Sequence, residues 1–159
     1  MTQLRVGMGY DVHQLQEGKP FWLGGVSIPH EKGAVGHSDA DVLIHTLCDA
    51  LLGAANLRDI GFHFPDTDSA YKGIDSKILL RQVVGLLRER GWAIQNIDAT
   101  VCLQKPKINP YIPEMKLALA EAMGVDADIL SIKATTTERL GFVGREEGVS
   151  AMAVALIVR

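Results

Sequence analysis

The sequence has few of the features that mark secreted, membrane or nucleic-acid-binding proteins. Its two cysteines, Cys48 and Cys102, form no CxxC pair and lie in apolar segments, so we expect reduced thiols in a core. No stretch approaches 18 consecutive apolar residues, and the N-terminus has no apolar leader, so no membrane span is expected. A net charge of −3 gives no basic footprint for nucleic acid, and any phosphate site must be local. These absences favour a cytoplasmic enzyme or binding domain.

The length and the apolar fraction predict one domain over residues 1–159, with a core of ordinary size. Glycines, prolines and hydrophobic periodicity divide the chain into elements. Its first half predicts a strand over 4–10, a hairpin over 21–29 turning at Gly24-Gly25, a helix over 39–55 and a loop over 56–73. Its second half predicts a helix over 74–90 ending at Gly91, a strand over 92–103, a helix from Asn109-Pro110 to Gly124, and strands over 131–135 and 148–159.

Three of these elements carry more detailed expectations. Ser38, followed by Asp41 three residues later, predicts the cap of the helix over 39–55, on which Asp41 and His45 share a face. The final strand is so densely apolar that we expect it to be buried on both faces. The order of elements predicts an α/β fold (an α+β sandwich), in which a mixed β-sheet carries one layer of helices.

A metal site is indicated by Asp11, His13 and His45. Asp11 and His13 are two residues apart at an expected strand end, so both side chains leave on one face. A carboxylate and two imidazoles form an ordinary three-ligand set for zinc, with the fourth position open for chemistry. The alternative is a surface hydrogen-bonded pair beside an unrelated helix histidine.

Three further segments have polar side chains that suit a phosphorylated ligand. Phe64-Pro65-Asp66-Thr67-Asp68 places two carboxylates on one turn, where they suit polyol hydroxyls or form an Asx-turn. Residues 133–145 combine three threonines, Glu138 and turn glycines, which suit a phosphate with a divalent ion or reflect β-propensity alone. Residues 103–110 join a strand to a helix through two prolines, and their backbone could read a planar base edge or serve as a plain connection.

Five ordered motifs together resemble the 2-C-methyl-D-erythritol 2,4-cyclodiphosphate synthase family over the whole chain. They are Gly9-Tyr10-Asp11-Val12-His13, His37-Ser38-Asp39-Ala40-Asp41, Asp59-Ile60-Gly61 with Phe64-Pro65-Asp66-Thr67-Asp68, Lys133-Ala134-Thr135-Thr136-Thr137-Glu138, and Arg145-Glu146-Glu147-Gly148. The resemblance implies a lyase of the non-mevalonate isoprenoid pathway. Its expected substrate is 4-diphosphocytidyl-2-C-methyl-D-erythritol 2-phosphate, whose 2-phosphate attacks its own β-phosphorus and releases CMP.

The resemblance also implies a role for each matching position. Asp11, His13 and His45 would bind one Zn²⁺ per subunit, and Glu138 would bind a Mg²⁺ or Mn²⁺ on the diphosphate. His37 and Thr136 would stabilise the transition state, with Ser38 beside them. The remaining substrate contacts would come from Asp59, Ile60 and Gly61 at the ribose, Phe64, Pro65, Asp66, Thr67 and Asp68 at the methylerythritol, Leu103, Gln104, Lys105, Pro106, Lys107, Ile108 and Asn109 at the cytosine, and Thr135 and Thr137 near the phosphates.

The resemblance further implies a homotrimer with active sites between neighbouring subunits. An isoprenoid diphosphate in an axial channel would meet Phe142 and Arg145, although Arg145 could equally be paired with Glu147. Two other functions remain open: a zinc-dependent phosphohydrolase, which would release free phosphate, and a non-catalytic trimer that binds isoprenoid diphosphates or a nucleotide.

Overall fold

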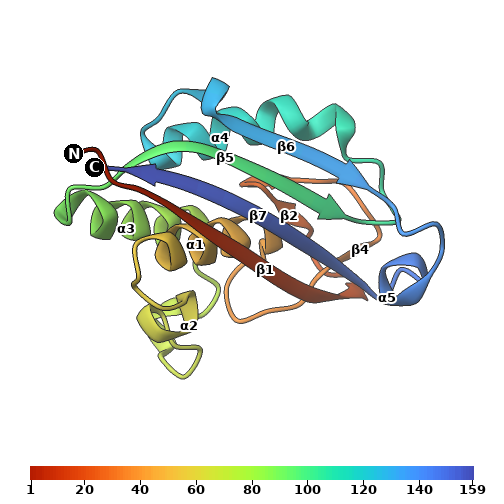
Figure 1. The fold of residues 1–159 in the computed structure, drawn as a ribbon. Helices are drawn as coiled ribbons and strands as arrows, with labels where there is room; N and C mark the ends of the chain where they lie inside the picture. Colours follow the sequence, from red (N-terminus) through yellow and green to blue (C-terminus); the bar gives the residue numbers. More distant parts are fainter.

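The computed structural model describes residues 1–159 (Figure 1). Its strands are β1 (Leu4–Glu17), β2 (Trp22–Leu23), β3 (Val26–Ser27), β4 (Lys32–Ala34), β5 (Ala93–Cys102), β6 (Leu130–Thr135) and β7 (Gly148–Val158). Its α-helices are α1 (Val42–Ala54), α2 (Ile60–His63), α3 (Ser76–Glu89), α4 (Ile112–Met123) and α5 (Gly141–Gly144). Short 3₁₀ turns cover Ser69–Tyr71, Asn109–Tyr111 and Ala127–Ile129. None of the helices has the length and apolar character that a membrane crossing requires.

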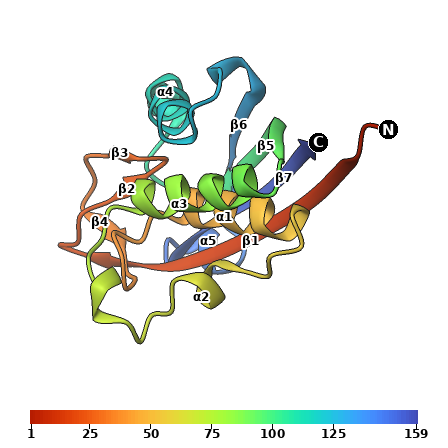
Figure 2. The same ribbon diagram turned by 90° about the vertical axis from the view of Figure 1, so that its left-hand side faces the viewer.

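The main sheet is mixed, as the sequence predicts. Its strand order is β4-β1-β7-β5-β6, with β5 and β6 parallel and the other neighbours antiparallel. Figure 2 shows the sheet curled around α1, α3 and α4, which gather on one side of it. The expected hairpin is present as β2 and β3, which turn at Gly24-Gly25. The sequence analysis missed β4, a three-residue strand that pairs with the end of β1.

Two glycines let α1 lie directly against β1. Gly7 and Gly9 are buried on the helix-facing side of the strand. A Cβ atom at Gly7 would overlap the carbonyl oxygen of Ala50, and one at Gly9 would overlap that of Thr46. Because side chains alternate along a strand, Asp11 and His13 point to the same side as these glycines. The close approach of α1 therefore places its first turn beside both candidate ligands.

Several expected boundaries are wrong for identifiable reasons. β1 continues to Glu17, so Asp11 and His13 lie within a strand that pairs with β7 and not at a strand end. Ser38 is not the cap of α1: Ala40 adopts a left-handed conformation (φ 59°), and Asp41 caps the helix by accepting the amide of Ile44. The expected loop over 56–73 contains α2 and a 3₁₀ turn, and the helix expected from Asn109 begins as a 3₁₀ turn before α4. Gly91 and Gly124 follow α3 and α4 in left-handed conformations, as the sequence predicts.

One face of the sheet is apolar and open in the single chain. The final strand is not buried on both faces, since Met152 and Val154 are 43% and 45% exposed. These side chains continue a row from β1 that comprises Leu4, Val6, Met8, Tyr10 and Val12, all exposed. The term "outer apolar face" is used below for these seven residues. Cys48 is buried and Cys102 half-buried, and both are free thiols as expected.

Candidate metal and substrate site

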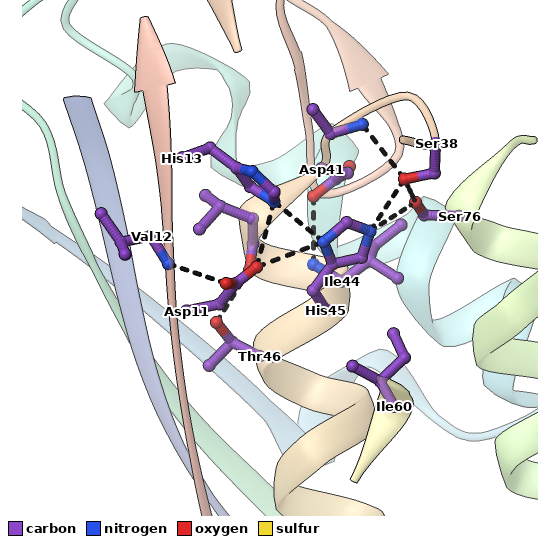
Figure 3. Close-up of polar contacts among 12 residues, drawn as sticks. Asp11, Val12, His13, Ser38, Asp41, Ile44, His45, Thr46, Ile60 and Ser76 are labelled. Carbon is purple, nitrogen blue, oxygen red and sulfur yellow. Dashed lines mark hydrogen bonds and ion pairs between the residues drawn. The ribbon is translucent and has the colours of Figure 1, made fainter. Parts of the chain in front are cut away.

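Asp11, His13 and His45 bring one ligand atom each to a common point. Nε2 of His13 lies 3.0 Å from Nδ1 of His45, and Oδ2 of Asp11 lies 3.1 Å and 3.2 Å from these two nitrogens (Figure 3). Ligand atoms about 2.0–2.1 Å from a tetrahedral Zn²⁺ would be roughly 3.3 Å apart. The three residues thus form a group that could hold a divalent metal ion.

The other atoms of Asp11 and His13 are held by the backbone. Nδ1 of His13 lies 3.0 Å from the carbonyl oxygen of Val35. A carbonyl only accepts, so Nδ1 carries a proton and the Nε2 lone pair of the neutral ring faces Asp11. Oδ1 of Asp11 accepts the amide of Val12 at 2.8 Å, which leaves Oδ2 for the site. The ligand atoms are therefore oriented before any ion binds.

The shared site shifts the pKa values of Asp11 and His13 in opposite directions. Burial by itself would raise the pKa of Asp11, but hydrogen bonds to His13 and His45 outweigh it and hold the pKa well below its usual range. Burial by itself would lower the pKa of His13, but the hydrogen bond to Asp11 and its negative charge raise it. Such a cluster favours a bound cation, whether a proton or a metal ion.

His45 is held on its far side by Ser38, a predicted site residue, and by Ser76, which the sequence analysis did not assign to the site. Its Nε2 atom lies 3.0 Å from the hydroxyls of both Ser38 and Ser76, and Ser76 is hydrogen-bonded to Asp39. Asp39 was noted only as part of a motif, and the region of Ser76 only as a helix start. Asp41, which we expected on the His45 face of α1, is fully buried and accepts the amides of Gly24 and Gly25 instead. Burial raises its pKa.

A cavity of about 350 Å³ lies beside the three candidate ligands. His13, His45 and Ser38 line it together with predicted substrate residues, and Tyr71 and Leu79, which the sequence analysis missed, complete the wall. The predicted substrate residues that line it are His37, Ile60, Gly61, Phe64 and Asp66. Asp49 of α1 fixes one side of this cavity, because its Oδ1 atom accepts the amide of Ile60 at 2.8 Å.

Other members of the same motifs do not line this cavity. Asp59 caps α2 by accepting the amide of Phe62 at 3.0 Å, and Asp68 caps a 3₁₀ turn by accepting the amide of Ala70 at 2.9 Å. The Asx-turn alternative thus describes the Asp68 carboxylate, while its backbone carbonyl accepts from Nε2 of His37 at 3.2 Å. Pro65 and Thr67 are likewise absent from the lining.

The predicted cytosine residues line a second, separate cavity of about 230 Å³. Its wall consists of Leu103, Gln104, Pro106, Lys107, Ile108, Asn109, Ala134, Thr135 and Thr136, none of which touches the first cavity. Lys105 points elsewhere and pairs with Glu146 at 3.2 Å. Within one chain, the predicted site residues therefore form two groups and not one.

The remaining predicted residues lie outside both cavities. Oε1 of Glu138 accepts the hydroxyl of Thr136, a residue of the second cavity, at 3.2 Å, and Thr137 donates to the carbonyl of Leu140 at 2.7 Å. Arg145 forms a two-point ion pair with Glu147, at 3.0 Å and 3.1 Å. Of the two roles considered for Arg145, this pairing is the one that the structure shows. Phe142 packs close to Gly148.

Comparison with known proteins assigns this chain to a family. The YgbB family profile matches residues 4–158. The 2-C-methyl-D-erythritol 2,4-cyclodiphosphate synthase of Cytophaga hutchinsonii is 60% identical over 157 residues, which cover 99% of each chain. The chain belongs to the YgbB family. It is an enzyme of this synthase family, a lyase.

Solved structures agree with this assignment. A 2C-methyl-D-erythritol-2,4-cyclodiphosphate synthase described as the CDP-bound form is 37% identical, with a TM-score of 0.89 over 96% of this chain and 99% of its own. The bifunctional IspDF from Campylobacter jejuni is 41% identical, with a TM-score of 0.95 over 99% of this chain. The match spans 42% of that longer protein.

Proposed function

We propose that the chain converts 4-diphosphocytidyl-2-C-methyl-D-erythritol 2-phosphate into 2-C-methyl-D-erythritol 2,4-cyclodiphosphate and CMP. An oxygen of the 2-phosphate attacks the β-phosphorus, the bond from that phosphorus to the α-phosphate oxygen breaks, and CMP leaves with the electron pair. The convergence of Asp11, His13 and His45 beside a cavity of about 350 Å³ is the observation that carries the proposal. It rests also on family membership in the non-mevalonate pathway.

The main obstacle to this reaction is charge, because one phosphate must approach another. A Zn²⁺ held by Asp11, His13 and His45 would act as a Lewis acid on a phosphate oxygen. The residues around it hold the substrate folded: His37 and Ser38 offer donors at the cavity wall, and Asp66 offers a carboxylate for the methylerythritol hydroxyls. Holding the phosphates in line supplies much of the rate enhancement, with little need for a protein base.

The separation of the two cavities supports a site shared between copies of the chain. We propose a homotrimer in which the cytosine cavity of one subunit, with Thr136, faces the metal-side cavity of its neighbour. The outer apolar face supplies a surface that association would bury, since patches of this kind mark interfaces. Glu138, which is exposed next to Thr136, would then reach the diphosphate and bind Mg²⁺ or Mn²⁺.

Three further parts of the proposal concern the protein as a whole. We propose that residues 1–159 form a single synthase domain and that it works in the cytoplasm. An isoprenoid diphosphate in an axial channel stays a prediction, and the pairing of Arg145 with Glu147 gives it no support.

Product analysis tests the reaction directly. The purified protein is incubated with the cytidylylated substrate and Mg²⁺, with and without a chelator, and the products are identified by mass spectrometry. We expect CMP and the cyclic diphosphate in equal amounts, and neither product with chelator. Free phosphate without the cyclic product would identify a phosphohydrolase. Substrate binding without any product would identify a non-catalytic binder.

A further inference from the structure

The imidazole of His45 has two distinct neighbourhoods, one on each ring nitrogen. Nδ1 faces Asp11 and His13, and Nε2 faces the hydroxyls of Ser38 and Ser76 (Figure 3). In a neutral ring only one nitrogen carries a proton, so only the other can bind a metal. The residues at Nε2 therefore decide whether Nδ1 is available as a ligand.

Hydrogen-bond accounting assigns that proton. Ser76 has one hydroxyl proton, and its Oγ atom is hydrogen-bonded to Oδ1 of Asp39. An ionised carboxylate only accepts, so the Ser76 proton is donated to Asp39. The Ser76 oxygen can then only accept, and its two possible donors are the Ser38 hydroxyl at 3.2 Å and Nε2 of His45 at 3.0 Å. With the Ser38 proton directed to Ser76, neither hydroxyl has a proton left for Nε2, so Nε2 is the donor and the lone pair of Nδ1 is available to a metal ion.

Two backbone amides hold the Asp39 carboxylate in the position where it accepts the Ser76 hydroxyl. Its Oδ2 atom accepts the amide of Ser76 at 2.9 Å, and its Oδ1 atom accepts the amide of Asp41 at 3.2 Å. The carboxylate thus joins the start of α3 to the segment that leads into α1. Ser76 is fully buried, so water does not compete for its hydroxyl.

We propose that Asp39 and Ser76 are positioning residues, which hold His45 in the Nε2–H tautomer and so present Nδ1 to the metal. Carboxylate partners behind metal-binding histidines fix the ring and strengthen it as a ligand, and their loss typically weakens metal binding 10–100-fold. Here the carboxylate acts through a serine. The inference rests on the proposed role of His45 as a ligand.

Ser38 offers a useful contrast to Ser76. Both hydroxyls lie 3.0 Å from Nε2, but Ser38 lines the cavity and accepts the amide of Ala40 at 3.2 Å, with no carboxylate behind it. Ser76 is absent from the cavity wall. A change in zinc affinity on removing the Ser76 hydroxyl therefore cannot come from a lost substrate contact.

Nitrogen-15 NMR of the metal-free wild-type protein tests the tautomer without any substitution. At a pH where the ring signals show His45 to be neutral, we expect the signals of a ring protonated on Nε2. A ring protonated on Nδ1 would overturn the proposal.

Zinc affinity, measured by competition with a chromophoric chelator, tests the positioning role of Ser76. We expect Ser76→Ala to weaken zinc binding about 10–100-fold, and Ser38→Ala to weaken it less. Asp75→Asn is the matched control, because Asp75 caps α3 one residue earlier through the amide of Lys77, and asparagine is an equally good cap. Its zinc affinity should equal that of the wild type.

The outcomes separate this inference from the proposed function. A folded Ser76→Ala protein with wild-type zinc affinity would overturn the positioning role of Asp39 and Ser76 while leaving the proposed metal ligands in place. A wild-type protein that binds no zinc would instead refute the ligand role of His45. If Ser76→Ala does not fold, the His45 tautomer measured by NMR in the wild-type protein decides the proposal.

Discussion

Gly9 of β1 lies against the carbonyl oxygen of Thr46 in α1 so closely that no side chain fits between them. Thr46 follows His45 in the chain, and Gly9 lies two residues before Asp11. The contact therefore sets the distance between strand and helix at the point where the candidate ligands meet. Packing of the backbone, and not only of side chains, therefore determines the geometry of the candidate metal site.

Gly9→Ala should damage both stability and metal binding. The added methyl group would overlap the backbone of α1, and overpacking of this kind typically costs about 1–3 kcal/mol, more where neither backbone can move. We expect a lower urea midpoint and weaker zinc binding. Gly85→Ala is the matched control, because Gly85 lies within α3 with nothing near its missing Cβ. That variant should gain about 0.5–1 kcal/mol from helix propensity. Equal midpoints for the two variants would contradict this account.

The pairing of Asp11 with His13 predicts a pH window of stability in the metal-free protein. The pKa of Asp11 is lowered on folding, so its contribution is present above the unfolded value of about 3.9 and is lost as pH falls through the folded value. The pKa of His13 is raised, so its contribution is complete below about 6.5 and is lost as pH rises through the folded value. In the presence of a chelator, the wild type should exceed Asp11→Asn in free energy of unfolding, and the difference should be largest between about pH 4 and 6.5.

Urea unfolding at several pH values measures this difference. Asp98→Asn is the control, because the Lys133 side chain beside Asp98 lowers the pKa of that carboxyl in the same way, and lysine stays charged to about pH 10.4. Its effect, below about 1 kcal/mol at a surface site, should be constant from about pH 5 to 9. An equally constant difference for Asp11→Asn would show that His13 is not its partner. With zinc present, the stability difference between the wild type and Asp11→Asn should instead grow as pH rises, since protons compete with the metal for its ligands.

How well the sequence predicts this site depends on how far apart along the chain the contacting residues are. Alternation along a strand places Asp11 and His13 on one face, and this local rule succeeds although the strand end was misplaced. The cap at Ser38 was wrong because Ala40 turns left-handed, which no propensity favours for alanine. The contact between Asp39 and Ser76 spans 37 positions and depends on how α3 packs against α1. No local pattern encodes it.

The division of the site into two cavities has the same origin. The family resemblance is confirmed, yet the order of motifs along the sequence does not show whether two motifs meet within one chain. His37 and Thr136, expected to act together, line different cavities. Only the packed structure separates them.

Glu138→Gln should weaken the response of turnover to Mg²⁺ or Mn²⁺ while the protein stays folded. The amide keeps one oxygen as an acceptor for the Thr136 hydroxyl but loses the negative charge that a hard divalent ion requires. Titrating either metal against initial rate should show half-saturation at a higher concentration. Glu114→Gln, at an exposed position in the first turn of α4, is the control and should titrate like the wild type. Identical curves for Glu138→Gln would remove Glu138 from the metal role.

Charging the outer apolar face should separate the assembly of the protein from its metal binding. Met8 is 69% exposed in the single chain and pairs in register with Val154 of β7. If this face is the interface between copies, Met8→Lys buries three unpaired charges in a trimer, and each uncompensated buried charge is strongly destabilising. Sedimentation should then show monomers. Leu117→Lys, at an equally exposed apolar position on α4, should leave the assembly unchanged.

The same Met8→Lys protein tests whether the two cavities work together across subunits. The metal ligands and their cavity belong to one chain, so the monomer should still bind one zinc ion. If the proposed trimer holds the cavity that contains Thr136 opposite the metal of a neighbour, turnover should be lost. A monomer with full turnover would show that a single chain closes both cavities around its substrate. A Met8→Lys protein that still sediments as a trimer would place the interface elsewhere.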